Sequence, residues 1–144
     1  MTTEDGFHGR ASAGVFRSIL VGYDGSSEAR YALVIAKYLA AQVRGTIHVL
    51  QVVRPSAHGE TTEDLAEAAR AELDRLSQGL EAATLITSVV ISDSPGEAIS
   101  HFATEHGVDL IVTGGHGREQ SVHRGMGHTL EALLRERACP VLVV

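Results

Sequence analysis

Residues 109–117 read Asp-Leu-Ile-Val-Thr-Gly-Gly-His-Gly, and this stretch decides the fold. Its apolar first half predicts a buried strand over residues 109–113. The glycines that follow let the main chain approach a phosphate closely and leave backbone N–H groups free to form an anion-binding nest. A strand that runs into such a loop and then into a helix is typical of a ligand site in an α/β protein.

The loop after this strand is unusually long. It extends from Gly114 to Gly127, which is fourteen residues, whereas βα connections usually have about 2 to 6. Arg118, His123 and Arg124 give it local positive charge within an acidic chain. Two interpretations remain open, a phosphate-binding loop and a flexible crossover whose glycines only permit tight turns.

The better-known phosphate motifs do not match this loop. A Walker loop requires a Lys at a fixed spacing after its glycines, and Gly117 is not followed by one. The segments Gly115-His116-Gly117 and Gly125-Met126-Gly127 both lack the third glycine of the dinucleotide fingerprint. The loop therefore belongs to another type of site.

Strand and helix patterns alternate outward from this stretch to both ends of the chain. Short apolar or β-branched runs predict further strands at residues 18–23, 46–53, 84–91 and 140–144. Apolar residues spaced three and four apart predict helices at residues 29–43, 61–80, 95–106 and 129–137.

Local signals mark the ends of these helices. A capping box and a proline in the first turn indicate helix starts, and a glycine after the last periodic residue indicates a left-handed helix stop. The residues concerned are Thr61 with Asp64 for the capping box, Ser94 with Pro95 and Glu97 for a capped start, and Gly45 and Gly107 for the stops.

The order of elements predicts the fold class. Strands that alternate with helices are joined by right-handed crossovers in a parallel sheet, and uninterrupted apolar strands need helices on both faces. We expect a single α/β domain over residues 15–144, a doubly wound, Rossmann-like parallel sheet of five strands. Residues 1–14 have no periodic apolar pattern and are expected to form a flexible N-terminal tail.

Composition argues against several functions. Asp and Glu number 18 against 12 Lys and Arg, a formal net charge of -6, so no nucleic-acid partner is expected. No apolar run approaches the ~20 residues that span a bilayer, and no membrane association is expected. The single Cys139 agrees with a reducing compartment, and we expect a cytoplasmic protein. The histidines lack metal-ligand spacing, so no metal site is expected.

The glycine spacing in the loop resembles that of the universal stress protein (UspA-like) family. ATP-binding members of that family have glycine, two residues, glycine, nine residues, and then glycine followed by Ser or Thr. Here Gly114, Gly117 and Gly127 fall at those spacings, and the fourth position is His128, with Thr129 one place later.

The resemblance extends over residues 16–144 and includes the stretches 22–26, 109–112 and 139–144. It implies a sheet in the order 3-2-1-4-5, like that of adenine nucleotide alpha hydrolases. In that order the turn at Asp24 would lie beside the loop that begins at Gly114, and one site would use both. From the residues alone, Asp24 before Gly-Ser is equally well explained as the cap of a turn.

By position, the resemblance also implies which residues contact the nucleotide. Gly22 and Asp24 would border the ribose and base, and Val52 would contact adenine. The phosphates would be held by Gly114, Gly115, His116, Gly117, Arg118, Glu119, Gln120, Gly127 and His128, with Thr129 placed to supply the hydroxyl that His128 lacks.

Three functions follow as hypotheses. The first is a cytoplasmic stress-response module that binds ATP, with or without Mg²⁺, in the glycine loop. The second is a family member that binds no nucleotide and acts through protein contacts, because His128 replaces the family Ser or Thr. The third is an ATP-hydrolysing enzyme, against which the sequence offers no pair of carboxylates and no general base beside the loop.

The last predicted strand suggests a homodimer. It ends in the apolar run from Val141 to Val144, and an exposed apolar strand at a sheet edge is an aggregation risk unless another chain covers it. The family often dimerises through antiparallel contact of these strands, which a two-fold axis makes self-complementary. The alternative is a last strand covered by its own helices.

Overall fold

The computed structural model describes residues 15–77, 83–115 and 127–144. The strands are β1 (Ser18–Gly22), β2 (Thr46–Val53), β3 (Thr84–Ile91), β4 (Leu110–Thr113) and β5 (Val141–Val143). The helices are α2 (Ser27–Val43), α3 (Thr62–Leu76), α4 (Pro95–Glu105) and α5 (His128–Glu136). The predicted tail, residues 1–14, and the predicted end of the second helix at Leu80 lie outside the described residues.

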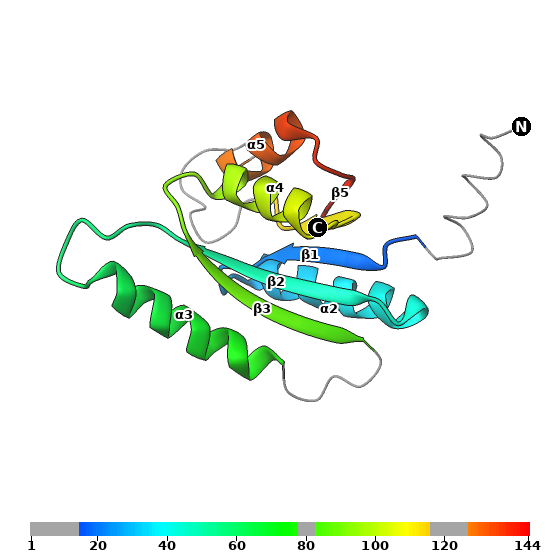
Figure 1. The fold of residues 1–144 in the computed structure, drawn as a ribbon, viewed down its shortest axis with the longest axis horizontal. Helices are drawn as coiled ribbons and strands as arrows, with labels where there is room; N and C mark the ends of the chain where they lie inside the picture. Colours follow the sequence, from blue (N-terminus) through cyan, green and yellow to red (C-terminus); the bar gives the residue numbers. More distant parts are fainter. Residues whose placement is uncertain (1–14, 78–82, 116–126) are drawn as a thin grey trace, which may run out of the picture.

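The five strands form one parallel sheet in the order β3-β2-β1-β4-β5. Helices α2 and α3 cover one face of this sheet and α4 and α5 the other (Figure 1). The expected fold class, strand order and two-sided helix cover are therefore confirmed. Since β1 lies between β2 and β4, the carboxyl ends of these three strands lie side by side.

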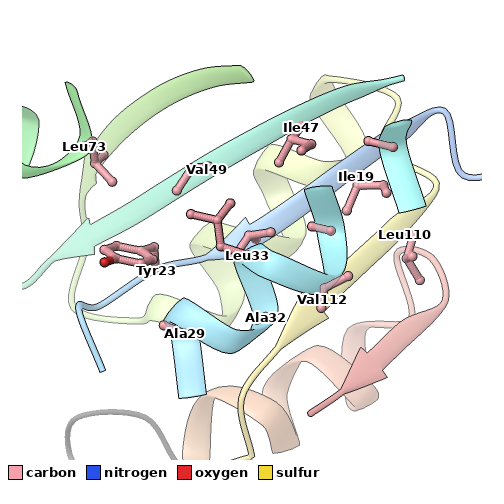
Figure 2. Packing of buried hydrophobic residues seen from close by; sticks show 13 residues of the cluster. Ile19, Tyr23, Ala29, Ala32, Leu33, Ile47, Val49, Leu73, Leu110 and Val112 are labelled. Atoms are coloured by element: carbon pink, nitrogen blue, oxygen red, sulfur yellow. The ribbon is translucent and has the colours of Figure 1, made fainter. Parts of the chain in front are cut away.

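The core has two layers because successive strand residues point to opposite faces of the sheet. Ile19 and Val21 of β1 pack with Leu33 of α2 in one layer (Figure 2). Leu20, between them in sequence, packs with Ile99 of α4 in the other layer. The apolar strands thus supply both layers, as their uninterrupted hydrophobicity predicts.

Asp109 joins the start of β4 to the start of β1. Its two carboxylate oxygens accept hydrogen bonds of 3.1 Å each from the backbone N–H groups of Arg17 and Ser18. These partners lie 92 and 91 positions from Asp109 in the sequence. The centre of the sheet is therefore built from the two halves of the chain.

The predicted helix ends are partly confirmed. Thr61 Oγ1 accepts a hydrogen bond from the Asp64 N–H at 3.1 Å, and Asp64 Oδ2 accepts one from the Thr61 N–H at 3.4 Å. Gly107 has the left-handed φ of 62°. The capping role predicted for the Ser94 side chain is wrong. Ser94 is at the N-cap of α4 without a side-chain cap bond, and its N–H donates to Ser92 Oγ at 3.1 Å.

The role predicted for Gly45 is also wrong. The left-handed residue at the end of α2 is Arg44, with φ 51°, whose N–H donates to the Ala40 carbonyl. A Cβ on Gly45 would lie 2.7 Å from the carbonyl oxygen of Arg17, just before β1. Glycine is therefore needed here because two segments of backbone approach closely, not because a helix ends.

His48 is a titratable side chain buried in the core layer beneath α4. It is 8% exposed, and its Nδ1 has no hydrogen-bond partner among the described residues. Its ring lies 5.5 Å from the rings of Phe102 and His106, measured between centroids. Burial, and to a smaller extent the nearby His106, lowers the pKa of His48 below its ordinary 6.5.

This pKa shift predicts loss of stability in acid. Because the folded-state pKa is depressed, the unfolded chain binds the proton first, so the contribution of neutral His48 is complete above pH 6.5 and declines as pH falls below it. We expect His48→Leu to flatten the dependence of the free energy of unfolding on pH below 6.5, measured in urea titrations. His101→Gln, at an exposed histidine, is the control. An unchanged slope in His48→Leu would contradict the assignment.

Candidate functional site

The carboxyl ends of β1, β2 and β4 bring the predicted site residues to one edge of the sheet. Gly22 ends β1, Asp24 follows two residues later, and Val52 is the next-to-last residue of β2. Gly114 follows the last residue of β4 directly. The turn at Asp24 therefore lies beside the start of the glycine loop, the arrangement that the strand order implies.

The Asp24 turn is held together by its own hydrogen bonds. Asp24 Oδ1 accepts from the Ser26 N–H at 2.9 Å, and Ser26 Oγ, the N-cap of α2, accepts from the Ala29 N–H at 3.1 Å. Gly25 has φ 79°, and its carbonyl accepts from the Arg30 guanidinium at 2.7 Å. These contacts accord with the turn-capping interpretation of Asp24.

Gly22 and Val52 lie on the side of the sheet that α4 covers. Val52 is partly buried and packs against the core layer of α4. A Cβ on Gly22 would lie 3.1 Å from Ile99 Cδ1, so the floor of the site is close to that helix. Next to Gly22, the Tyr23 N–H donates to the Leu50 carbonyl at 2.8 Å, which fixes the path of the chain out of β1.

Gly114 touches a residue that sequence reasoning missed. A Cβ on Gly114 would lie 2.7 Å from both the Cβ and the Oε2 of Glu28, in the first turn of α2. A single carboxylate therefore lies directly against the first glycine of the loop. The sequence feature that could have indicated Glu28 is its position in the first turn of the helix that follows Asp24.

The far end of the loop returns to its beginning. The Gly127 N–H donates to the Gly115 carbonyl at 3.1 Å. Gly127 is the N-cap of α5, and no side chain among the described residues caps this helix. His128 is the first residue of α5, one position earlier than predicted, with an exposed side chain, and Thr129 follows half-buried.

Two helix starts with different electrostatic character thus face the same edge. The start of α2 is capped by Ser26 and carries the carboxylate of Glu28. The start of α5 offers first-turn N–H groups that no described side chain caps, together with the positive end of the helix dipole. The start of α5 therefore favours an anion at this edge.

The remaining predicted residues, His116, Gly117, Arg118, Glu119 and Gln120, lie outside the described residues. Within residues 15–77, 83–115 and 127–144, no group of three or more His, Cys, Asp or Glu could hold a metal ion. In those same ranges no helix combines the length and apolar character needed to cross a membrane.

A hollow of about 660 Å³ lies elsewhere on the molecule. Its walls come from the end of β3, from α4 and from the end of α5, and include Val90, Phe102 and Glu136. None of the residues predicted to contact a nucleotide lines it. We assign the candidate site to the carboxyl edge of the sheet, where the predicted residues meet.

Residues 16–144 match the model of the universal stress protein family. The chain belongs to that family. A universal stress protein encoded in the QAH/OAS sulfhydrylase 3′ region of Thermus aquaticus is 32% identical over 140 residues, which is 90% of this chain and 99% of that protein. The resemblance inferred from the glycine spacing is thereby confirmed.

Solved universal stress proteins share the fold. UspA from Lactobacillus plantarum superimposes with a TM-score of 0.76 at 29% identity, covering 91% of this chain and 99% of that one. A universal stress protein from Archaeoglobus fulgidus, solved in complex with dAMP, superimposes with a TM-score of 0.68 at 21% identity, covering 90% and 98%. The doubly wound sheet is common to all three chains.

Proposed function

We propose that this chain binds an adenine nucleotide, ATP with or without Mg²⁺, at the carboxyl edge of the sheet. In this proposal it acts in the cytoplasm as a binding and signalling module of the stress response, as its family membership suggests. The site would be formed by the Asp24 turn, the end of β2, the glycine loop and the start of α5. The dAMP complex of the relative from Archaeoglobus fulgidus supports an adenine ligand.

The start of α5 is the observation that carries this proposal. Its first-turn N–H groups have no side-chain cap, and the bond from the Gly127 N–H to the Gly115 carbonyl keeps that end next to β4. A helix start of this kind favours phosphate through both its free donors and its dipole. The spacing of Gly114, Gly117 and Gly127 supports the same placement of the phosphates.

The other end of the site suits a nucleoside. Val52 supplies a partly buried apolar contact for adenine. The Asp24 carboxylate follows the end of β1, and a carboxylate is suited to accept from a ribose hydroxyl. Ribose and base would thus lie over β1 and β2, and the phosphates over β4 and α5.

Mass spectrometry of small molecules released from freshly purified protein tests this proposal. Retained ATP, ADP or AMP is expected, and calorimetry at millimolar ATP with Mg²⁺ should give saturable heat. A site that is empty and also gives no heat and no thermal shift with ATP would contradict the proposal.

His128→Ser is expected to raise the affinity for ATP. Serine would restore the hydroxyl that the family pattern has at this position, and a hydrogen bond to a charged phosphate corresponds to about a tenfold to hundredfold change in Kd. Calorimetric titration of the unaltered protein and of His128→Ser measures this change in Kd. His128→Ala is the control, because it removes the imidazole without adding a hydroxyl. Equal affinities in the serine and alanine variants would show that the hydroxyl does not contribute.

A nucleotide-free function through protein contacts is the second candidate. It is favoured by an apolar stripe on the outer face of α2, where Tyr31, Val34 and Tyr38 are 58%, 61% and 69% exposed. Exposed aromatic residues at helical spacing are typical of protein interfaces. An empty site that ignores added nucleotide would favour this function over the first.

We also propose a homodimer formed through β5. This strand is at one end of the sheet order, and Leu142 and Val143 are 37% and 44% exposed. Antiparallel pairing with β5 of a second copy would bury these side chains and satisfy the outer backbone groups of the strand.

A further inference from the structure

The outer edge of β3 is not paired with any strand in the part of the chain that the structure describes. β3 is first in the strand order, and its inner edge pairs with β2 over all eight residues. The Thr84 N–H donates to the Gly45 carbonyl at 3.1 Å, and the Ser92 N–H donates to the Val53 carbonyl at 3.0 Å. Because the backbone groups of a parallel strand alternate between its two edges, the even-numbered residues of β3 face β2. The odd-numbered residues, from Leu85 to Ile91, therefore face outward.

This edge has the features of one that accepts another strand. None of the eight residues of β3 is buried, whereas all four residues of β4 are. Proteins usually protect a free edge with charged residues, proline or a bulge. β3 contains no charged residue and no proline, and its register with β2 is continuous. Its side chains Ile86 and Ile91 are 44% and 45% exposed.

The hollow of about 660 Å³ begins where β3 ends. It is lined by Val90 of β3 and by Ala98, Phe102 and Glu105 of α4, which share one face of that helix. Val90 and Phe102 belong to the same core layer and give the hollow an apolar floor. Glu105, whose Oε1 lies 3.0 Å from His101 Nε2, has an exposed side chain. Among the described residues that line the hollow there are glutamates but no Lys or Arg, so it suits a cationic group above an apolar floor.

We propose that the outer edge of β3 binds an extended peptide of a partner protein, which places a basic side chain in the hollow. The odd-numbered residues of β3 would exchange main-chain hydrogen bonds with the peptide, and these bonds supply affinity. A lysine or arginine fits the hollow because its aliphatic stem packs on apolar surface while its charged head stays in water. The head would pair with Glu105. This site shares no residue with the proposed nucleotide site and does not depend on it.

A lone strand fits this edge better than a second copy of the chain does. Helix α3 packs against β3 (Figure 1). Neighbouring strands in a sheet lie about 4.8 Å apart, whereas packed helices need about 8 to 10 Å between their axes. Pairing of β3 with β3 of a second copy would therefore bring two α3 helices into the same space, and an extended peptide carries no such helix.

The probe is a fluorescent peptide of alternating Thr and Val with a central Arg, Thr-Val-Thr-Arg-Thr-Val-Thr, blocked at both ends. Titration against the full-length protein by fluorescence anisotropy should give saturable binding. Replacing the Arg of the peptide with Glu should weaken binding by about tenfold, because a repulsion replaces an attraction. A peptide methylated on every backbone nitrogen should not bind, since it has no main-chain donors.

Amide hydrogen exchange, followed by NMR, locates the bound peptide. In the protein alone, the N–H groups of Ile86, Ser88 and Val90 face β2 and should exchange slowly, while those of Thr87 and Val89 should exchange faster. Saturation with the peptide should slow exchange at Thr87 and Val89 by at least about tenfold and change the other three little.

Two variants separate the main-chain contribution from the charge. Thr87→Pro removes an outward donor that β2 does not use, a position where an edge strand accepts proline, and should weaken peptide binding by about tenfold. Glu105→Gln should weaken it by about twofold to fivefold. Glu131→Gln is the matched control, because Glu131 lies in the first turn of α5 and does not line the hollow. Thermal unfolding verifies that each variant is folded.

Three results would overturn the proposal. The first is no binding of the Arg peptide, or binding without slower exchange at Thr87 and Val89. The second is equal binding of the Arg and Glu peptides, or an equal loss in Glu105→Gln and Glu131→Gln, which would remove the basic side chain from the site. The third is protection of Thr87 and Val89 that rises with protein concentration alone, which would make a second copy the occupant. Each result is obtained without nucleotide, so the proposed nucleotide function stands or fails separately.

Discussion

Replacing Gly114 with alanine is expected to lower the free energy of unfolding by about 1 to 3 kcal/mol and to weaken nucleotide binding. The added Cβ would lie 2.7 Å from the Cβ and Oε2 of Glu28 and 3.6 Å from its carbonyl carbon. The carboxylate can rotate away, but the Cβ of a helical residue cannot. Either the first turn of α2 or the end of β4 must therefore move, and both border the proposed site.

Gly115→Ala is the neighbouring control for this prediction. Its Cβ would meet Val143 Cγ1 at 3.7 Å, an ordinary contact, so stability should change by less than about 0.5 kcal/mol. Urea titration gives the free energies, and calorimetry gives the ATP affinities. Adding Glu28→Ala to Gly114→Ala removes the overlap with Oε2 but keeps the overlap with Cβ, so only part of the stability should return. Equal stability of the two single alanine variants would contradict the packing argument.

Leu142→Lys is expected to convert the proposed dimer into a monomer. Leu142 is the middle residue of β5, and the middle of a short self-pairing strand lies nearest the two-fold axis. The substitution removes two buried leucines, one from each copy, at about 1.5 to 3 kcal/mol each, and places two positive charges together. The dimer dissociation constant should rise by more than about a hundredfold.

Sedimentation or light scattering at micromolar concentration measures this change. Val34→Lys is the matched control because Val34 is exposed on α2, away from β5. If Val34→Lys dissociated the dimer and Leu142→Lys did not, the interface would lie on the helix face. A monomeric unaltered protein would remove the basis of the proposed dimer.

Much of the fold could be predicted because its signals are local. The β-branched runs of β2 and β3 match the structure at both ends, and the capping box of Thr61 depends on residues three apart. The prediction for Gly45 failed because the atom that excludes a side chain there, the Arg17 carbonyl oxygen, belongs to another segment of the chain. A glycine between a helix and a strand has the same local pattern whether it ends the helix or makes room for another backbone segment.

In the candidate site, too, residues with a local sequence signal could be predicted and residues brought in by tertiary packing could not. Gly114 was found through its spacing, whereas Glu28 was missed because it enters the site only when α2 packs against the end of β4. A carboxylate in the first turn of a helix is common for helix-dipole reasons alone. Only the three-dimensional contact distinguishes Glu28 from such a residue.

The pairing of β1 with β4 also sets the time at which this site can form during synthesis. The Asp109 carboxylate that bonds to the Ser18 N–H is added 91 residues later, which at about 5 to 20 residues per second is about 5 to 20 s. Throughout that interval the edge of β1 that later accepts β4 is without its partner. The nascent chain therefore passes through a stage with an unpaired central strand, when incorrect strand pairing competes with folding, and the proposed nucleotide site can form only after this stage.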